Sequence, residues 1–266
     1  MEDPLRGQVT RSAAEVYEEF FVPALFQEWA PRVVSAAGVG PGQRVLDVAC
    51  GTGVVAREAA RRVEPGGSVA GLDRNDDMIA VARRVSPALE WRLGRAEALP
   101  FGDGSFDAVL CQFGLMFFDD RVTTLREMSR VLKPGGRTTV AVWDALESSP
   151  GYAAMARLLQ RLFGDRVADQ LRFPFALGSA EALRSLFREA GMRHVGLQTL
   201  SGMARFPSIE SWVHTDIKGW TLAQLIDESQ YQTLLTVARR ELAPFVRPEG
   251  TVEFGIAAHI VTAARP

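Results

Sequence analysis

The sequence has 266 residues, enough for one large domain with a substantial core, and its composition (47% hydrophobic, 23% charged) is that of an ordinary folded protein. The formal net charge is −2, and no basic block interleaved with aromatic residues occurs, so we expect no nucleic-acid partner. The two cysteines, Cys50 and Cys111, form neither a disulfide framework nor a metal-ligand cluster, so no metal is expected. The first residues do not resemble a signal peptide, and the sequence lacks a run of about 18 apolar residues that could span a membrane. We therefore expect a cytoplasmic protein without a membrane span.

The first segment, residues 11–30, is predicted to be helical with a wide aromatic face. Pro23 should divide it into two short helices or bend it. Because the segment carries more aromatic surface than a packing helix needs, we expect residues 1–30 to form a helical lid over a small-molecule site, with Tyr17 facing the ligand. Ordinary core packing is the alternative interpretation.

From residue 31 to residue 143, predicted helices and strands alternate, which is typical of βαβ units in a parallel sheet with helices on both faces. Ligands of such sheets bind beyond the carboxyl ends of the strands, at the topological switch point. We expect the first strand to lie at that point. The expected strands cover residues 44–49, 68–73, 89–93, 106–112 and 138–143, and the expected helices cover 31–37, 54–63, 75–85 and 119–132.

The last third is predicted to contain more helix. The expected helices are 150–163, 179–190 and 207–243, and the expected strands are 195–200 and 252–263. No linker separates these parts, so we expect one domain over residues 1–266. Its α/β core would comprise 31–146, 176–206 and 251–266, with helical cap segments at 147–175 and 207–250.

The first strand ends in the turn Gly51-Thr52-Gly53, which precedes an alanine-rich helix. Such a turn leaves free N–H groups at the helix N-terminus and lets a ligand approach the main chain closely. The spacing of a phosphate-binding P-loop is absent. The turn does fit the dinucleotide pattern Gly-x-Gly-x-x-Gly/Ala, with Asp73 as the acid about 20 residues later, so alone it is ambiguous.

The surrounding residues favour a nucleoside with an amino-acid tail. Asp47 suits a cationic amine and would repel a pyrophosphate. Asp73 can accept from both ribose hydroxyls, Met78 can cover an adenine face, and Ala96 with Glu97 can meet the adenine amino edge. These features together describe S-adenosylmethionine.

Five segments within residues 40–143 resemble the class I, seven-strand S-adenosylmethionine-dependent methyltransferases, especially the UbiE-like small-molecule branch. They are residues 45–53, 71–73, 94–101, 106–109 and 131–137. The resemblance implies a Rossmann-like, doubly wound sheet with strand order 3-2-1-4-5-7-6 and an antiparallel last strand. Two residues depart from the family pattern: Ala49, where many members have glycine, and Arg95, where an acid is common. The residues expected around the cofactor are Tyr17, Asp47, Ala49, Gly51, Thr52, Gly53, Asp73, Arg74, Met78, Ala96, Glu97, Gln112 and Phe113.

Methyl transfer requires a nucleophile held in line behind the methyl group and protected from water. Residues 111–116, after the fourth strand, should line the transfer site. The pattern Asn/Asp-Pro-Pro-Tyr/Phe of enzymes that methylate amide or adenine nitrogens is absent there. The apolar cap then favours O- or C-methylation of a small apolar or aromatic acceptor.

His214, in the cap, is the first candidate for a general base. His194 is expected at the surface and His259 in a structural hydrogen bond, while Tyr152 and Tyr17 are alternative bases. A carbon or preionised nucleophile would need no base. Two other functions stay open, an NAD(P)-dependent oxidoreductase and a non-catalytic S-adenosylmethionine-binding protein, and a homodimer is compatible with the sequence.

Overall fold

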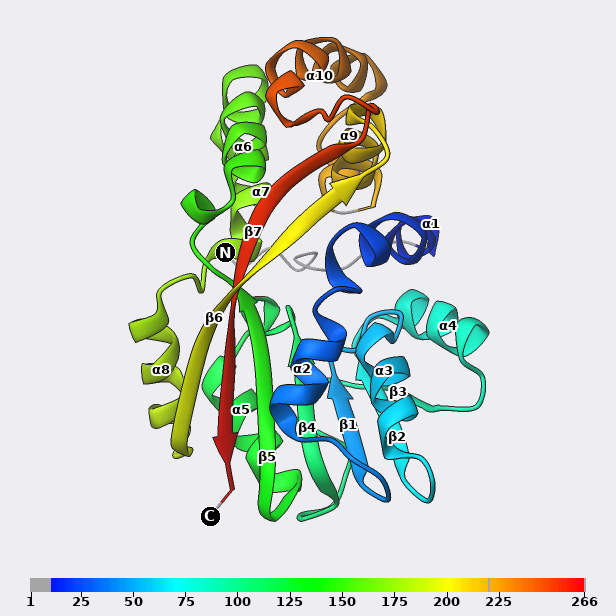
Figure 1. The fold of residues 1–266 in the computed structure, drawn as a ribbon, viewed down its shortest axis with the longest axis vertical. Coiled ribbons are helices and arrows are strands. Elements are labelled where there is room, and N and C mark those ends of the chain that lie inside the picture. Colours follow the sequence, from blue (N-terminus) through cyan, green and yellow to red (C-terminus); the bar gives the residue numbers. More distant parts are fainter. Residues whose placement is uncertain (1–10, 220, 266) are drawn as a thin grey trace.

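The computed structural model describes residues 11–219 and 221–265, which form a seven-stranded sheet flanked by helices (Figure 1). The strand order is β3-β2-β1-β4-β5-β7-β6, as expected from the family resemblance. Strands β1 to β5 are parallel, and β7 runs antiparallel to both β5 and β6. The strands are β1 (Arg44–Val48), β2 (Ser68–Asp73), β3 (Glu90–Leu93), β4 (Phe106–Gln112), β5 (Leu132–Trp143), β6 (Arg193–Phe206) and β7 (Val252–Ala264).

The helices lie on the faces of the sheet and beyond its upper end, with α2 in front of the strands and α5 behind them in Figure 1. The α-helices are α1 (Arg11–Val16), α2 (Ala30–Ala37), α3 (Val54–Val63), α4 (Asp76–Val85), α5 (Arg121–Val131), α6 (Pro150–Phe163), α7 (Asp165–Arg172), α8 (Ala180–Glu189), α9 (Ile209–Lys218) and α10 (Glu228–Glu241). The segment η1 (Tyr17–Phe26) is a π-helix, and the short 3-10 turns are η2 (Leu115–Phe117), η3 (Leu146–Ser148), η4 (Phe173–Phe175), η5 (Thr221–Gln224) and η6 (Ala243–Phe245).

Helices α6, α7, α9 and α10 gather beyond the carboxyl ends of β1, β4 and β5 (Figure 1). They come from the two segments expected to form the cap. A two-stranded ribbon of β6 and β7 leads to these helices. Strand β7 pairs with β6 from Val252 to Ala264, whereas it pairs with β5 only from Ala258 to Ala264. The predicted strand 195–200 is too short, since β6 extends to Phe206, whose ring stacks on Trp212 in α9.

The boundary between α5 and β5 also differs from the prediction. We expected Lys133-Pro134-Gly135-Gly136 to separate a helix from a strand that starts at Thr138. Instead, β5 begins at Leu132, directly after α5, and pairs with Phe106 before the register shifts. The strand thus accommodates the proline and glycines in its irregular first part.

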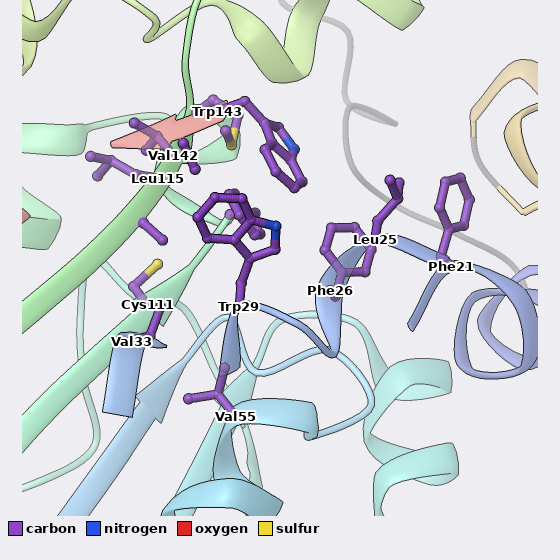
Figure 2. Packing of buried hydrophobic residues seen from close by; sticks show 14 of the residues in the cluster. Phe21, Leu25, Phe26, Trp29, Val33, Val55, Cys111, Leu115, Val142 and Trp143 are labelled. Atoms are coloured by element: carbon purple, nitrogen blue, oxygen red, sulfur yellow. The ribbon is translucent and has the colours of Figure 1, made fainter. Parts of the chain in front are cut away.

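The N-terminal segment is continuous with the core. Pro23 lies inside the π-helix η1, where Gln27 donates to the carbonyl of Val22, so the expected break takes the form of a wider helical turn. Phe26 and Trp29 point towards Trp143 at the end of β5 (Figure 2), with ring centroids 6.2 and 5.8 Å from that of Trp143. These contacts fit the core interpretation, while the lid interpretation stays a prediction, and residues 1–10 of the expected lid lie outside the described residues.

Within residues 11–219 and 221–265, none of the helices has the length and hydropathy needed to cross a bilayer.

Candidate functional site

The turn between β1 and α3 contains three residues with left-handed backbone: Ala49 (φ 55°), Gly51 (φ 53°) and Gly53 (φ 91°). Its two glycines have different roles. Gly51 borders a cavity, whereas a Cβ on Gly53 would lie 2.2 Å from the ring of Trp91. Gly53 is therefore required for packing and Gly51 for access to the main chain.

Asp73, at the end of β2, holds this turn in place. Its Oδ2 accepts from the N–H of Gly51 at 2.8 Å, and its Oδ1 accepts from the N–H of Asn75 at 2.9 Å. Burial raises the pKa of Asp73, while the two N–H donors and Arg74 act in the opposite direction. The side chain of Asn75 in turn accepts from the N–H of Met78 and begins α4. The carboxylate of Asp73 thus connects the glycine turn to the end of β2, and it also borders the cavity described next.

The cavity beside the turn has an empty volume of about 730 Å³. It brings together ten of the thirteen residues expected around the cofactor. These are Tyr17, Ala49, Gly51, Asp73, Arg74, Met78, Ala96, Glu97, Gln112 and Phe113. Six further lining residues were not among the thirteen, and all but Gly114 lie outside the segment 111–116 that the sequence also singled out: Leu72, Asn75, Gly94, Gly114, Phe117 and Phe118. Of the segment 111–116, only Gln112, Phe113 and Gly114 line it, because Cys111, Leu115 and Met116 are buried in the core.

Asp47, Thr52 and Gly53 do not border this cavity. Asp47 is 1% exposed, and its Oδ2 accepts from the N–H of Ala56 at 2.9 Å. Burial raises the pKa of Asp47 to about 8, against the opposing effect of that hydrogen bond. In this structure Asp47 therefore fixes the first turn of α3, and its direct contact with a ligand amine stays a prediction.

The polar groups around the cavity fit S-adenosylmethionine. Asp73 and Glu97 provide carboxylates at two separate places. Gln112 donates from Nε2 to the carbonyl of Phe26 at 3.1 Å, while its buried Oε1 has no hydrogen-bond partner among the residues that the structure describes. That oxygen can accept from an ammonium group, as carbonyl acceptors do. Among the described residues that line the cavity, Arg74 is the one cation, and its Nη1 lies 4.0 Å from Asp119 Oδ2, so this lining offers little to a pyrophosphate.

Arg95, the second departure from the family pattern, also lies near Asp119. Its guanidinium donates to Asp119 Oδ2 at 2.6 Å, and its Nε is 3.5 Å from Glu97 Oε2. The arginine therefore partly neutralises the acid expected at the adenine amino edge.

A second, apolar cavity adjoins the first. It has an empty volume of about 530 Å³ and shares Phe113 and Phe117 with the cofactor cavity. Segment η1, the end of β5 and the cap contribute its other walls. The remaining lining residues are Phe21, Leu25, Phe26, Trp143, Tyr152, Gln170, Leu171, Pro174, Phe175 and Asp216.

The histidines lie outside both cavities. His214 is half-buried with its ring 5.7 Å from Phe20, and His194 is exposed. His259 is buried and bonded through its ring nitrogens to Thr199 Oγ1 and the Gly178 carbonyl. A catalytic role for His214 therefore has no geometric support here and stays a prediction.

Asp216 borders the apolar cavity and was missed. Its sequence signal is an acid on the buried face of α9, four residues after Trp212 and three after Val213, both 0% exposed. Within the described ranges, no group of three or more His, Cys, Asp or Glu is arranged to hold a metal ion.

Comparison with known proteins decides the family. A family model described as a methyltransferase domain matches residues 46–140. The demethylmenaquinone methyltransferase of Beutenbergia cavernae is 36% identical over 188 residues, which cover 65% of this chain and 75% of that protein. The chain belongs to the class I S-adenosylmethionine-dependent methyltransferases. Its cofactor is S-adenosylmethionine, which supplies an electrophilic methyl group on a sulfonium.

Solved structures of low sequence identity share the fold. The YcgJ protein of Bacillus subtilis has a TM-score of 0.61 at 21% identity, covering 90% of this chain and 98% of that chain. Haemonchus contortus phosphoethanolamine N-methyltransferase 2, in complex with S-adenosylhomocysteine, has a TM-score of 0.62 at 18% identity, covering 97% of this chain and 58% of that one. At these identities the similarity shows the fold alone.

Proposed function

We propose that this methyltransferase methylates a small aromatic or apolar acceptor held in the second cavity. The observation that carries the proposal is the shared wall: Phe113 and Phe117 border both the cofactor cavity and the apolar cavity. An acceptor in the second cavity would thus lie beside the methyl donor. Burial among aromatic residues also excludes water, which the transfer requires.

The protein's part in the reaction is positioning. Asp73 and the Gly51 main chain would hold the ribose and the tail of the cofactor, and Glu97 would meet its adenine. Phe113 and Phe117 would orient the acceptor against the methyl group. Since the described histidines lie outside both cavities, the site favours an acceptor that needs no histidine base, such as an acidic hydroxyl or an activated ring carbon.

The relatives support an aromatic acceptor of the quinol type. The Beutenbergia protein is named for methylation of demethylmenaquinone, and here a quinol-like acceptor is part of the proposal. A nicotinamide oxidoreductase is disfavoured, because the antiparallel last strand departs from the parallel 3-2-1-4-5-6 order of dinucleotide folds.

Two measurements test the proposal. Calorimetry should show that S-adenosylhomocysteine binds and that NADH does not. Incubation with radiolabelled cofactor and a panel of phenols, quinols and alkylamines should label the aromatic hydroxyl compounds. Tight NADH binding without S-adenosylhomocysteine binding would favour the oxidoreductase. Cofactor binding without label in any panel member or cell extract would favour a non-catalytic binding protein.

A further inference from the structure

The apolar cavity contains a buried acid. Asp216 in α9 is 2% exposed, Tyr152 in α6 is 4% exposed, and both border the cavity. The hydroxyl of Tyr152 donates to Asp216 Oδ1 at 3.3 Å. The second oxygen, Oδ2, has no hydrogen-bond partner within the described part of the chain. Half of a buried carboxyl group is therefore unsatisfied beside an open volume.

Packing alone does not explain why the buried position 216 is occupied by an aspartate. It forms no ion pair with a described arginine or lysine, and burying such a group without a full set of partners is costly. Burial raises the pKa of Asp216 to about 8, with Trp212 and Tyr152 acting in the opposite direction. Although Trp212 affects this pKa, its indole Nε1 has no partner of hydrogen-bonding geometry among the described residues. An apolar side chain would pack at position 216 without these costs.

Asp216 lies away from the cofactor. It does not border the cofactor cavity, and a series of ring contacts separates it from the shared wall. Phe113 stacks on Trp143 at 3.6 Å, Trp143 lies 6.5 Å from Phe175, and Phe175 lies 5.6 Å from Tyr152. A ligand group that reaches Asp216 would therefore be remote from the methylated atom.

We propose that Asp216 determines acceptor specificity by binding a hydroxyl group at the end of an aromatic acceptor remote from the methylated atom. The inference rests on the proposed function, since it assumes that the acceptor occupies the apolar cavity. It narrows the substrate class to flat aromatic compounds with a hydroxyl group opposite the reacting position, such as hydroquinones and naphthols.

A hydroxyl group suits this carboxyl group better than other polar groups. It can donate to Oδ2 when Asp216 is ionised and accept from it when Asp216 is protonated. An ammonium group would require the ionised form, and a ketone oxygen would require the protonated form. An anionic group would be repelled by the ionised form and would lose its hydration among the aromatic walls. The flat ring of such an acceptor matches the aromatic lining around Trp143 and Phe175.

Two isosteric probes can test this hydrogen bond directly. 2-Naphthol and 2-methylnaphthalene differ by a hydroxyl in place of a methyl group. Their affinities would be measured by equilibrium dialysis at pH 7 against the full-length protein saturated with S-adenosylhomocysteine. The native protein should bind 2-naphthol about tenfold more tightly, as expected for one hydrogen bond to a buried carboxyl group.

Three variants test whether the difference in affinity between the two probes depends on Asp216. Asp216→Leu should reduce the ratio of affinities to about one, and the near-isosteric Asp216→Asn, which is the variant expected to fold most readily, should reduce it to about threefold. Glu210→Gln, an acid on the same helix that pairs with Arg239, should leave the ratio unchanged. All should retain the affinity for S-adenosylhomocysteine.

Three outcomes would overturn the inference: equal binding of both probes by the native protein, no binding of either probe, or an undiminished ratio in both Asp216 variants. An undiminished ratio in both variants would show that Tyr152 and Trp212 supply the hydrogen bonds of Asp216 within the protein. Failure of the native protein to bind S-adenosylhomocysteine would instead count against the proposed function, so the two failures are distinguishable.

Discussion

Phe113 stacks on Trp143 with ring centroids 3.6 Å apart and planes inclined by 11°. Phe113 follows β4 and Trp143 ends β5, so the pair joins two neighbouring strands at their carboxyl ends. Phe113 borders both cavities, and its φ of 55° is unusual for a bulky residue. The stacked pair therefore supports the part of the wall between the two cavities that Phe113 forms.

Replacing Phe113 with leucine should affect transfer more than cofactor binding. Loss of the stacked ring should lower the free energy of unfolding by about 1–2 kcal/mol. It should slow methyl transfer about tenfold or more, because the acceptor is less well oriented. Single-turnover rates and S-adenosylhomocysteine affinity would be compared with those of Phe101→Leu, whose ring packs on Phe106 outside both cavities. Equal effects on transfer in the two variants would contradict a wall function for Phe113.

Asp73→Asn should weaken binding of S-adenosylhomocysteine by about 10- to 100-fold, since charge-assisted hydrogen bonds to the ligand become neutral ones. The glycine turn would also lose part of its anchor, because Asp73 accepts from Gly51. Asp76→Asn, an exposed acid at the start of α4, provides the matched control for loss of charge. Calorimetry on both variants checks the prediction, and an unchanged affinity for Asp73→Asn would remove Asp73 from the binding site.

The sequence indicated more of the residues that line the first cavity than of those that line the apolar cavity. The positions of Asp47 near the end of β1 and of Asp73 at the end of β2 could be predicted from the sequence, because short apolar runs followed by turn residues indicate where strands end. Whether each residue then borders the cavity depends on side-chain packing, which is why Asp47, Thr52 and Gly53 do not line it although the sequence places them beside residues that do. Asp216 could not be assigned to the apolar cavity, since that wall forms only where α6 and α9, distant in sequence, meet.

Ala49→Gly should stabilise the protein. The φ of Ala49 is 55°, a left-handed conformation that costs an L-residue with a Cβ roughly 1–2 kcal/mol. Glycine removes that strain but loses more conformational entropy on folding, so the net gain should be about 0.5–1 kcal/mol. Ala60→Gly, within α3, should instead destabilise by about 1 kcal/mol. Urea unfolding of the two variants would show opposite signs, and a destabilised Ala49→Gly would indicate that the methyl group packs favourably.

The ionisation of Asp216 should make stability depend on pH. Its pKa is raised by burial to about 8, whereas an aspartate in an unfolded chain titrates near about 3.9. Between these values the folded protein holds a proton that the unfolded chain has released, so the free energy of unfolding should fall as pH rises from about 4 to 8. The slope is up to about 1.4 kcal/mol per pH unit for one group. Asp47, whose pKa is also raised to about 8, adds to it.

Asp216→Asn isolates the contribution of Asp216, because the amide is neutral at every pH. The variant should match the native protein at about pH 4 and below and become relatively more stable as the pH rises towards 8, while Asp47 still gives both proteins a residual slope. Glu210→Gln, which replaces an exposed acid on α9, should not change the slope in this range. Urea unfolding at pH 5, 6, 7 and 8 measures the difference. Parallel curves for the native protein and Asp216→Asn would mean that Asp216 is ionised in the folded state throughout, and that its carboxylate has found compensating partners in the cavity wall.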